Sequence, residues 1–306
     1  MNNSTTCESA DYLAKNGQLH AMLIIRVIIA VCGLVLLAAL LRFQGTYLSF
    51  HSNARVLMFS HHSWIVLQCV TSIVHHLFNL IRFASDNGLP CQYVVKTSLA
   101  VAIRGPSLFT TYGQVWSLVA LAVERLFASN RYRNYESSDR LFGFCLLLLQ
   151  WLFSSICLYI ALRDTVLSEL QAYPTVSSSK NSAIVSNIHF FLAAMEAISI
   201  IIFAGLRWYN RRKKALLTTA PLTEKYQIDE NIRATQLMFP MIITHFCCFM
   251  PSLCAVNVLA VTLCFDNHQA RFDSAMETSV GQSAVFAFAK DMDVNPYELD
   301  VGGMVL

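Results

Sequence analysis

The amino-acid sequence predicts an all-α membrane protein, a bundle of transmembrane helices, and three observations lead to this fold class. First, 55% of the 306 residues are hydrophobic and only 13% are charged, whereas soluble domains carry about 25% charged residues. Second, several stretches are long and apolar enough to cross a bilayer. Third, the basic residues concentrate in alternate loops. Together these features exclude an ordinary soluble domain.

The predicted spans follow from the length of the apolar stretches, because a helix needs about 20 mostly apolar residues to cross the hydrocarbon core. Six stretches qualify, at about 22–41, 56–83, 97–127, 141–162, 183–208 and 236–265. The third is the most polar in its middle, but we still expect it to form one span. The predicted organisation is therefore an N-terminal segment at 1–21, a transmembrane bundle at 22–265 and a tail at 266–306.

The tail differs in composition from the bundle. It carries seven acidic and two basic residues, and its longest apolar run covers only Ala284 to Ala289. Such a run is too short to cross a bilayer. The sequence therefore shows six visible spans and no clear seventh helix, and six crossings would leave the tail outside.

Orientation follows from the Lys and Arg residues of the loops, because cytosolic loops are enriched in both. The loops after the first, third and fifth spans hold thirteen basic residues, against four for the alternate loops. The N-terminus is therefore expected outside the cell, and the segment around residues 209–236 is expected in the cytosol. The first twenty residues lack the basic start and early apolar core of a cleavable signal peptide.

Several functional classes have no support in the sequence. A net charge of +3 gives a nucleic-acid partner little basis. No GxSxG, HExxH or P-loop motif occurs, and the adjacent histidine pairs cannot chelate on one helix face, because neighbours are about 100° apart. We therefore predict no enzymatic activity, no cofactor and no metal site. The partner that the composition does predict is membrane lipid.

An acidic and a basic residue stand together at the cytosolic end of the third span. Glu124 and Arg125 fit an ionic switch, which pairs or releases when helices shift. They equally fit an ordinary interfacial pair that extends toward the headgroups. The sequence leaves both readings open.

The segment "LTEKYQIDENIRATQLMFP", at 222–240, is polar and lies before the sixth span. Asp229 and Arg233 stand four residues apart in the order that supports a helix. Apolar residues recur at helical spacing, so the sixth helix is expected to extend below the membrane as an amphipathic helix. Its face would suit a cytosolic partner. The alternative is a solvated stalk above a basic collar that contacts lipid headgroups.

Ionisable groups within membrane spans are costly and point to function. Helical rise places several of them at the outer end of the bundle and one near mid-membrane. A group of these residues could line an outward-opening ligand pocket with Glu196 as its floor. For each residue taken alone, the alternative is a satisfied hydrogen bond between helices, which the sequence leaves open and favours. The members of the group are His75, Asn79, Arg104, His189 and Glu196.

Two cysteines are placed on the outer face. Cys91 lies at the outer start of the third span, and the next outer loop contains no cysteine. Cys7 is the other cysteine on this face. The topology therefore permits a Cys7–Cys91 disulfide, which we treat as a hypothesis.

Four motifs resemble one known family. The stretches "AVERLFASNRYRNYE", "AIRGP" and "HSNARVLMFSHH", and above all "LTEKYQIDENIRATQ", are similar to the nematode serpentine chemoreceptors. Within these, the chain most resembles serpentine receptor class alpha/beta, in the Sra superfamily of G-protein-coupled receptors. The resemblance covers about residues 1–265.

The resemblance implies a seven-helix receptor in the plasma membrane, often of a sensory cilium, with an external small-molecule ligand. It implies coupling to a heterotrimeric G protein through the cytosolic loops. By carry-over, Arg125 would hold the inactive state. The residues expected to face the G protein are Arg131, Tyr226, Gln227, Asp229, Glu230, Asn231 and Arg233.

One feature departs from the family pattern, since a seventh helix is expected and none is visible. A truncated isoform, a misassigned last exon and a divergent six-helix product each account for this. The leading hypothesis is a chemosensory G-protein-coupled receptor. The alternatives are a non-signalling partner that associates with another receptor chain and a small-solute transporter, which the clustering of polar groups at the two membrane faces disfavours.

Overall fold

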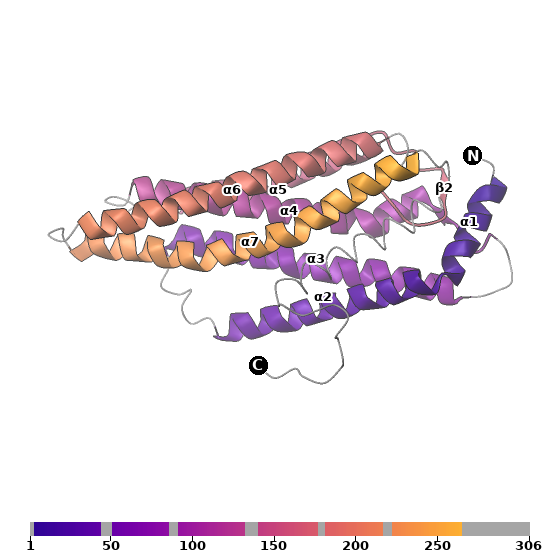
Figure 1. The fold of residues 1–306 in the computed structure, drawn as a ribbon, viewed down its shortest axis with the longest axis horizontal. Coiled ribbons are helices and arrows are strands. Elements are labelled where there is room, and N and C mark those ends of the chain that lie inside the picture. The colour runs from indigo at the N-terminus through magenta and orange to yellow at the C-terminus, as the bar shows by residue number, and fades with distance from the viewer. Residues whose placement is uncertain are drawn as a thin grey trace.

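A computed structural model describes residues 3–43, 51–85, 91–131, 140–176, 181–216 and 222–264, which are predominantly helical (Figure 1). The acidic tail at 266–306 lies outside the described residues. In chain order the elements are α1 (Asn3–Lys15), α2 (Gly17–Phe43), α3 (Ser52–Ala84), β1 (Val95–Lys96), α4 (Thr97–Asn130), α5 (Leu141–Leu162), β2 (Leu170–Gln171), α6 (Ser182–Leu216) and α7 (Leu222–Cys264).

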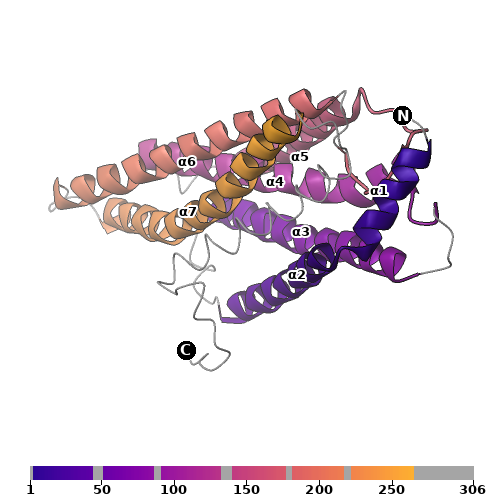
Figure 2. The same ribbon diagram turned by 45° about the vertical axis from the view of Figure 1, so that its right-hand side comes forward.

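Six long helices, α2 to α7, run along the longest axis of the described part of the molecule (Figures 1 and 2). Their bounds agree with the six predicted spans to within a few residues, with two exceptions at one end of the bundle. There α6 continues to Leu216 and α7 already begins at Leu222. The predicted fold class, an all-α bundle of six long helices, is confirmed, and the polar segment at 222–240 is helical as expected.

Membrane-spanning character differs among these helices. By length and composition alone, α2, α3, α5 and α6 are the four described helices that are apolar enough to cross a membrane. In contrast, α4 contacts α3, α5, α6 and α7 and buries polar residues such as Gln114, Glu124 and Arg125. Polar side chains in a membrane bundle face its interior, so the low hydropathy of α4 follows from its central position.

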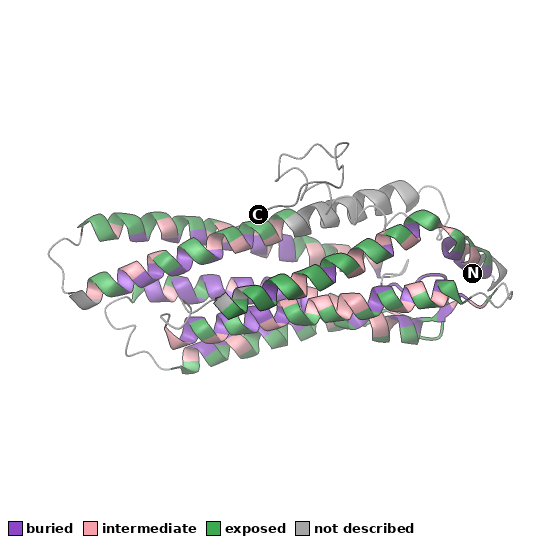
Figure 3. Cartoon of the chain, turned by 90° about the horizontal axis from the view of Figure 1, so that it is seen from below, coloured by how far each residue is buried: buried purple, intermediate pink, exposed green. Residues whose placement is uncertain are grey.

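The outward faces of the helices are largely exposed, whereas buried residues face the neighbouring helices (Figure 3). The main buried apolar cluster joins five helices through residues such as Leu57 of α3, Leu121 of α4, Leu146 of α5, Phe203 of α6 and Met238 of α7. Exposed apolar faces are what a lipid environment requires, since lipid tails are as apolar as these side chains.

A short helix and a pair of short strands at one end of the bundle were missed by the sequence analysis. α1 places Ala10, Leu13 and Ala14 in a buried cluster with Tyr93 and Tyr173. β1 pairs with β2 in antiparallel register, Val95 opposite Gln171. Two-residue strands are too short to show alternation, and the three apolar residues of α1 are spaced for one helix face but lie in a segment that is polar overall.

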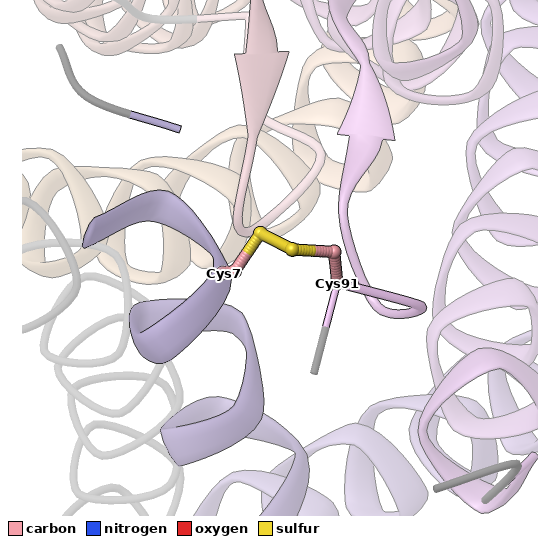
Figure 4. The surroundings of a disulfide bond; sticks show 2 residues. All are labelled: Cys7 and Cys91. Atoms are coloured by element: carbon pink, nitrogen blue, oxygen red, sulfur yellow. A yellow bond between two sulfur atoms is a disulfide. The ribbon is translucent and has the colours of Figure 1, made fainter. Parts of the chain in front are cut away.

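The structure contains the Cys7–Cys91 disulfide that the sequence permitted. It connects α1 to the segment before β1, with the two Cα atoms 4.7 Å apart (Figure 4). The bond closes a loop of 84 residues. Disulfides that close long loops typically stabilise by about 2–4 kcal/mol, so this bond holds α1 against the end of the bundle.

The disulfide predicts a specific labelling pattern. In the purified wild-type protein, neither Cys7 nor Cys91 should react with a maleimide unless reductant is added. Cys7→Ser should free the exposed Cys91, which then labels without reductant, as peptide mass spectrometry would show. Cys91→Ser is the matched control, in which the buried Cys7 should label more slowly. Labelling of wild-type Cys91 without reductant would contradict the bond.

Candidate functional site

The predicted ionic pair lies fully inside the bundle near the end opposite α1. The guanidinium of Arg125 donates to both carboxylate oxygens of Glu124, from Nε at 2.5 Å and from Nη2 at 2.6 Å. Glu124 is 0% and Arg125 is 1% exposed. Side chains buried to this extent do not extend to the headgroups, as the members of an ordinary interfacial pair would.

Arg125 also connects α4 to α7. Its Nη1 donates to Oδ1 of Asn231 at 3.1 Å. We call Glu124, Arg125 and Asn231 the α4–α7 bridge. One turn further along α4, Ser129 accepts a hydrogen bond from Asn210 of α6 at 3.1 Å. The bridge and this bond hold three helices together where the sequence placed their cytosolic ends.

A second contact joins α7 to the start of α3. The backbone N–H of His51, the residue before α3, donates to Oε1 of Glu230 at 2.7 Å. Glu230 thus satisfies a backbone donor at a helix N-terminus, as a capping carboxylate does. Burial lowers the pKa of His51, although the carboxylates of Glu230 and Glu124 act in the opposite direction.

The structure divides the residues that the resemblance assigned to a G-protein face. Gln227, Glu230 and Asn231 are buried, and the last two contact α3 and α4. These three side chains are not at the surface in this structure, because one face of the amphipathic helix packs into the bundle. Tyr226 and Arg233 are exposed.

The remaining two residues of that set also lie at the surface. Arg131 is exposed, with its guanidinium 5.2 Å from the centre of the Phe127 ring. Asp229 is half-buried and pairs with Lys214 of α6 at 2.6 Å. The sequence suggested that Asp229 pairs with Arg233, four residues further along the same helix. In the structure, Lys214 of the neighbouring helix α6 provides the positive charge instead.

A second polar cluster lies deeper in the bundle and contains a residue that the sequence analysis missed. His245 of α7 contacts Oε1 of Glu196 through Nδ1 at 2.5 Å and Oε1 of Gln114 through Nε2 at 3.0 Å. We call these three residues the Glu196 cluster. Its signal in the sequence was a single histidine within the apolar run "MIITHFCCF", which is where an intramembrane ionisable group points to function.

The other predicted pocket residues lie mainly toward the α1 end. Arg104 Nη1 lies 3.0 Å from Nε2 of His75, and Tyr173 Oη lies 3.4 Å from the same nitrogen. Asn79 accepts a hydrogen bond from Arg82 at 3.1 Å. We call Arg104, His75 and Tyr173 the Arg104 cluster.

His189 lies against Tyr112, with ring centres 5.9 Å apart. The five predicted pocket residues are therefore not one continuous lining. The structure pairs His75 with Arg104 and Asn79 with Arg82. Glu196 contacts His245 of α7, and no residue of α7 was among the predicted pocket residues. None of the five lines the groove of about 540 Å³ that opens between α3 and α5. Among the described residues, no group of three His, Cys, Asp or Glu side chains could hold a metal ion.

Long helices with exposed apolar faces, packed around buried polar clusters, define a helical membrane bundle. Comparison with known proteins gives the family. The family described as "Serpentine type 7TM GPCR receptor class ab chemoreceptor" matches residues 4–279. The chain belongs to this family, whose members are receptors and not enzymes.

Curated relatives from Caenorhabditis elegans agree with this assignment. Serpentine receptor class alpha/beta-14 is 24% identical over 203 residues, which cover 64% of this chain and 51% of that protein. Serpentine receptor class beta-17 is 23% identical over 260 residues, 82% of this chain and 71% of that protein. Serpentine receptor class alpha-39 is 26% identical over 156 residues, 50% of this chain and 41% of that protein. The chain thus spans about half the length of the first of these relatives.

Proposed function

We propose that the protein is a chemosensory receptor that binds an external small-molecule cue and signals through a heterotrimeric G protein. The observation that carries this proposal is the buried α4–α7 bridge. A fully buried charge pair is costly to form in a low-dielectric interior. Such a pair at the junction of two helices suits a switch with two arrangements, one bridged and one released.

The topology that goes with this proposal places residues 1–21 outside, the bundle 22–265 in the plasma membrane and the α4–α7 bridge at its cytosolic end. The excess of Lys and Arg in the loops at that end supports it. The exposed residues Arg131, Tyr226 and Arg233 would then face the G protein, and family resemblance makes the sensory cilium the expected location. The acidic segment 266–306 forms a third part of the chain in this scheme.

We place the cue-binding region around the Glu196 cluster. Oε2 of Glu196 and Oη of Tyr112 are buried without a hydrogen-bond partner among the described residues, which is costly for a polar atom. A ligand that donates a hydrogen bond to the Glu196 carboxylate would relieve the first of these. Gln114 lies ten residues before Glu124 on α4 (124 − 114 = 10), about 15 Å away along the helix.

The Glu196 cluster and the bridge therefore join α4 and α7 at two levels. A ligand bound at the Glu196 cluster would change the position of α7 relative to α4. The same displacement would then act on the contact between Arg125 and Asn231. Coupling of this kind needs a two-state element that both sites bias, and α7 is that element in this proposal.

Asn231→Ala tests the role of the bridge. It removes the oxygen that accepts from Arg125 but leaves the Glu124–Arg125 pair intact. Hydrogen bonds to charged groups contribute about 1.5–3 kcal/mol, so the released state should become about tenfold or more populated. Basal exchange of guanine nucleotide should rise by a similar factor in vesicles that contain the receptor and heterotrimers of the main G-protein classes.

Asn231→Asp is the matched control, because it retains an oxygen acceptor for Arg125 and should keep basal exchange near the wild-type rate. Receptor content is equalised by quantitative immunoblot of the vesicles. Equal basal exchange in wild type and Asn231→Ala, with every G-protein class, would count against a switching role for the bridge.

A further inference from the structure

A groove between α3 and α5 belongs neither to the bridge nor to the Glu196 cluster. It has a volume of about 540 Å³ and opens on the outward side of the two helices. Arg55 and Phe59 of α3 line it toward the α3 N-terminus, and Trp64, Leu67 and Trp151 line it further in. This volume lies within the range of about 300–1,000 Å³ found for small-molecule sites.

The length of the groove matches one leaflet of a bilayer. Its lining on α3 extends from Ser52 to Leu67, which is fifteen residues (67 − 52 = 15), or about 22 Å at 1.5 Å per residue. Half of a bilayer, headgroups included, measures about 20–22 Å. The groove thus reaches from the headgroup level to about the membrane midplane.

The walls of the groove suit a hydrocarbon chain. Phe59 is 70% exposed, and the rings of Trp64 and Trp151 lie 4.4 Å apart at the inner end. Two of the three serine hydroxyls that line the groove already donate hydrogen bonds. Ser60 donates to Gln150 at 2.8 Å and Ser63 donates to the Phe59 carbonyl at 2.9 Å. An apolar occupant would therefore not break a hydrogen bond of either serine.

The end of the groove at the α3 N-terminus, which the proposed topology places at the cytosolic face, carries a basic residue. Arg55 is exposed, and its guanidinium makes no hydrogen bond or ion pair with a described residue. Arg140 is also exposed and precedes Gly143 by three residues. A Cβ atom on Gly143 would lie only 2.9 Å from Oδ1 of Asn53, so α5 and α3 touch at this level. Arg55 therefore lines the groove at the level where a headgroup would lie, and Arg140 stands about one helical turn from the contact between α3 and α5.

We propose that this groove binds one acyl chain of an anionic phospholipid, with the phosphate at Arg55 and the chain extending past Phe59 to Trp64 and Leu67. Exposed apolar surface alone would not single out a site on a membrane protein. The concave shape, the match to one leaflet and the Arg55 guanidinium at the headgroup level, which pairs with no residue of the described part of the chain, do so together. The site rests on the location of the bundle in a membrane and is independent of G-protein coupling.

Tryptophan fluorescence offers a direct test, because brominated acyl chains quench indole rings on contact. The chain has four tryptophans, and the Trp116→Phe/Trp208→Phe variant retains only the two that line the groove. It is reconstituted in phosphatidylcholine nanodiscs with rising fractions of dibrominated phosphatidylserine or dibrominated phosphatidylcholine. A basic residue near a membrane surface contributes about fivefold to the binding of anionic lipid, so half-maximal quenching should need about fivefold less of the anionic lipid.

Arg55→Gln should bring the two lipids to parity. Arg211→Gln is the matched control, an exposed arginine of α6 that does not line the groove, and it should preserve the preference. Native mass spectrometry of the protein without tryptophan substitutions should show one retained phosphatidylserine in wild type and about fivefold less of this bound species in Arg55→Gln.

Three results would overturn the proposal. Equal quenching by both lipids in the protein with Arg55 would mean contact with bulk lipid only. Absence of quenching by either lipid would mean that a second copy of the chain covers the groove. Displacement of the brominated lipid by cholesterol at equal mole fraction would assign the groove to a sterol.

Discussion

Replacing Glu124 by alanine is expected to lower the free energy of unfolding by about 3–5 kcal/mol, the usual result of removing one partner from a buried ion pair. The carboxylate is 0% exposed and accepts two hydrogen bonds from Arg125. Without it, the positive charge of Arg125 stays buried without the opposite charge and without two of its hydrogen-bond acceptors. SDS titration of the protein in mixed micelles measures the effect.

The chain offers a matched control in another pair of adjacent residues. Arg163 and Asp164 form an ion pair at 3.2 Å, but the two side chains are 54% and 46% exposed. Exposed pairs contribute about 0–1 kcal/mol, so Asp164→Ala should lower the free energy of unfolding by about 1 kcal/mol at most. An equal decrease in the free energy of unfolding for Glu124→Ala and Asp164→Ala would show that burial does not determine how much the Glu124–Arg125 pair contributes to stability.

A double-mutant cycle separates the pair from its surroundings. Glu124→Ala/Arg125→Ala removes both charges, so the double variant should lose clearly less than the sum of the two single losses. Arg125→Ala also removes the contact with Asn231, so it should raise basal nucleotide exchange as Asn231→Ala does.

Replacing Gly113 by alanine is expected to destabilise the bundle by about 1–3 kcal/mol, as overpacking of a dense core does. A Cβ atom at this position would lie 2.5 Å from two atoms of the Trp64 ring. The ring cannot move away cheaply, because its Nε1 donates to Gln150 at 3.4 Å and it packs against Phe109 and Trp151. Loss of thermal stability in detergent measures the effect.

Gly205 is the matched control on α6, since a Cβ atom there would meet nothing within 4 Å. Gly205→Ala should be neutral or slightly stabilising, because alanine favours helix over glycine by about 1 kcal/mol. In a Trp64→Ala background, Gly113→Ala should lose its effect, since the ring that opposes the new methyl group is gone. A full loss of stability in that background would place the cause elsewhere.

Much of the candidate site could be anticipated from residue type and height along a helix. Glu124 and Arg125 were recognised as a pair because an acid and a base at a span boundary are uncommon. Glu196 was recognised because an ionisable group near mid-membrane is costly. The contact partners of Glu124–Arg125 and of Glu196 could not be anticipated. The periodicity of a helix shows which of its faces is apolar, but not which residues of another helix that face will contact. His245 and Asn231 emerge only once α7 is placed against α4 and α6.

The same limit explains the residues that were assigned to the wrong face. Periodicity showed that the segment at 222–240 is a helix with one apolar face, and this helix is present. It did not show that Glu230 would turn inward to bind the backbone of His51, or that Asp229 would find Lys214 instead of Arg233. A charged residue of a neighbouring helix can therefore take the place of the expected partner four residues further along the same helix, as Lys214 does for Asp229.

By itself, the sequence determined that this is a helical membrane protein, where most of its long helices lie, and which family its motifs resemble. These features depend on composition, on local periodicity and on short motifs, all of which are carried by contiguous residues. The tertiary structure decided the rest: the α4–α7 bridge, the Glu196 cluster, the docking of α1 by Cys7 and Cys91, and the groove beside Arg55. Each of these joins residues far apart in the chain, and only helix packing brings them within contact distance.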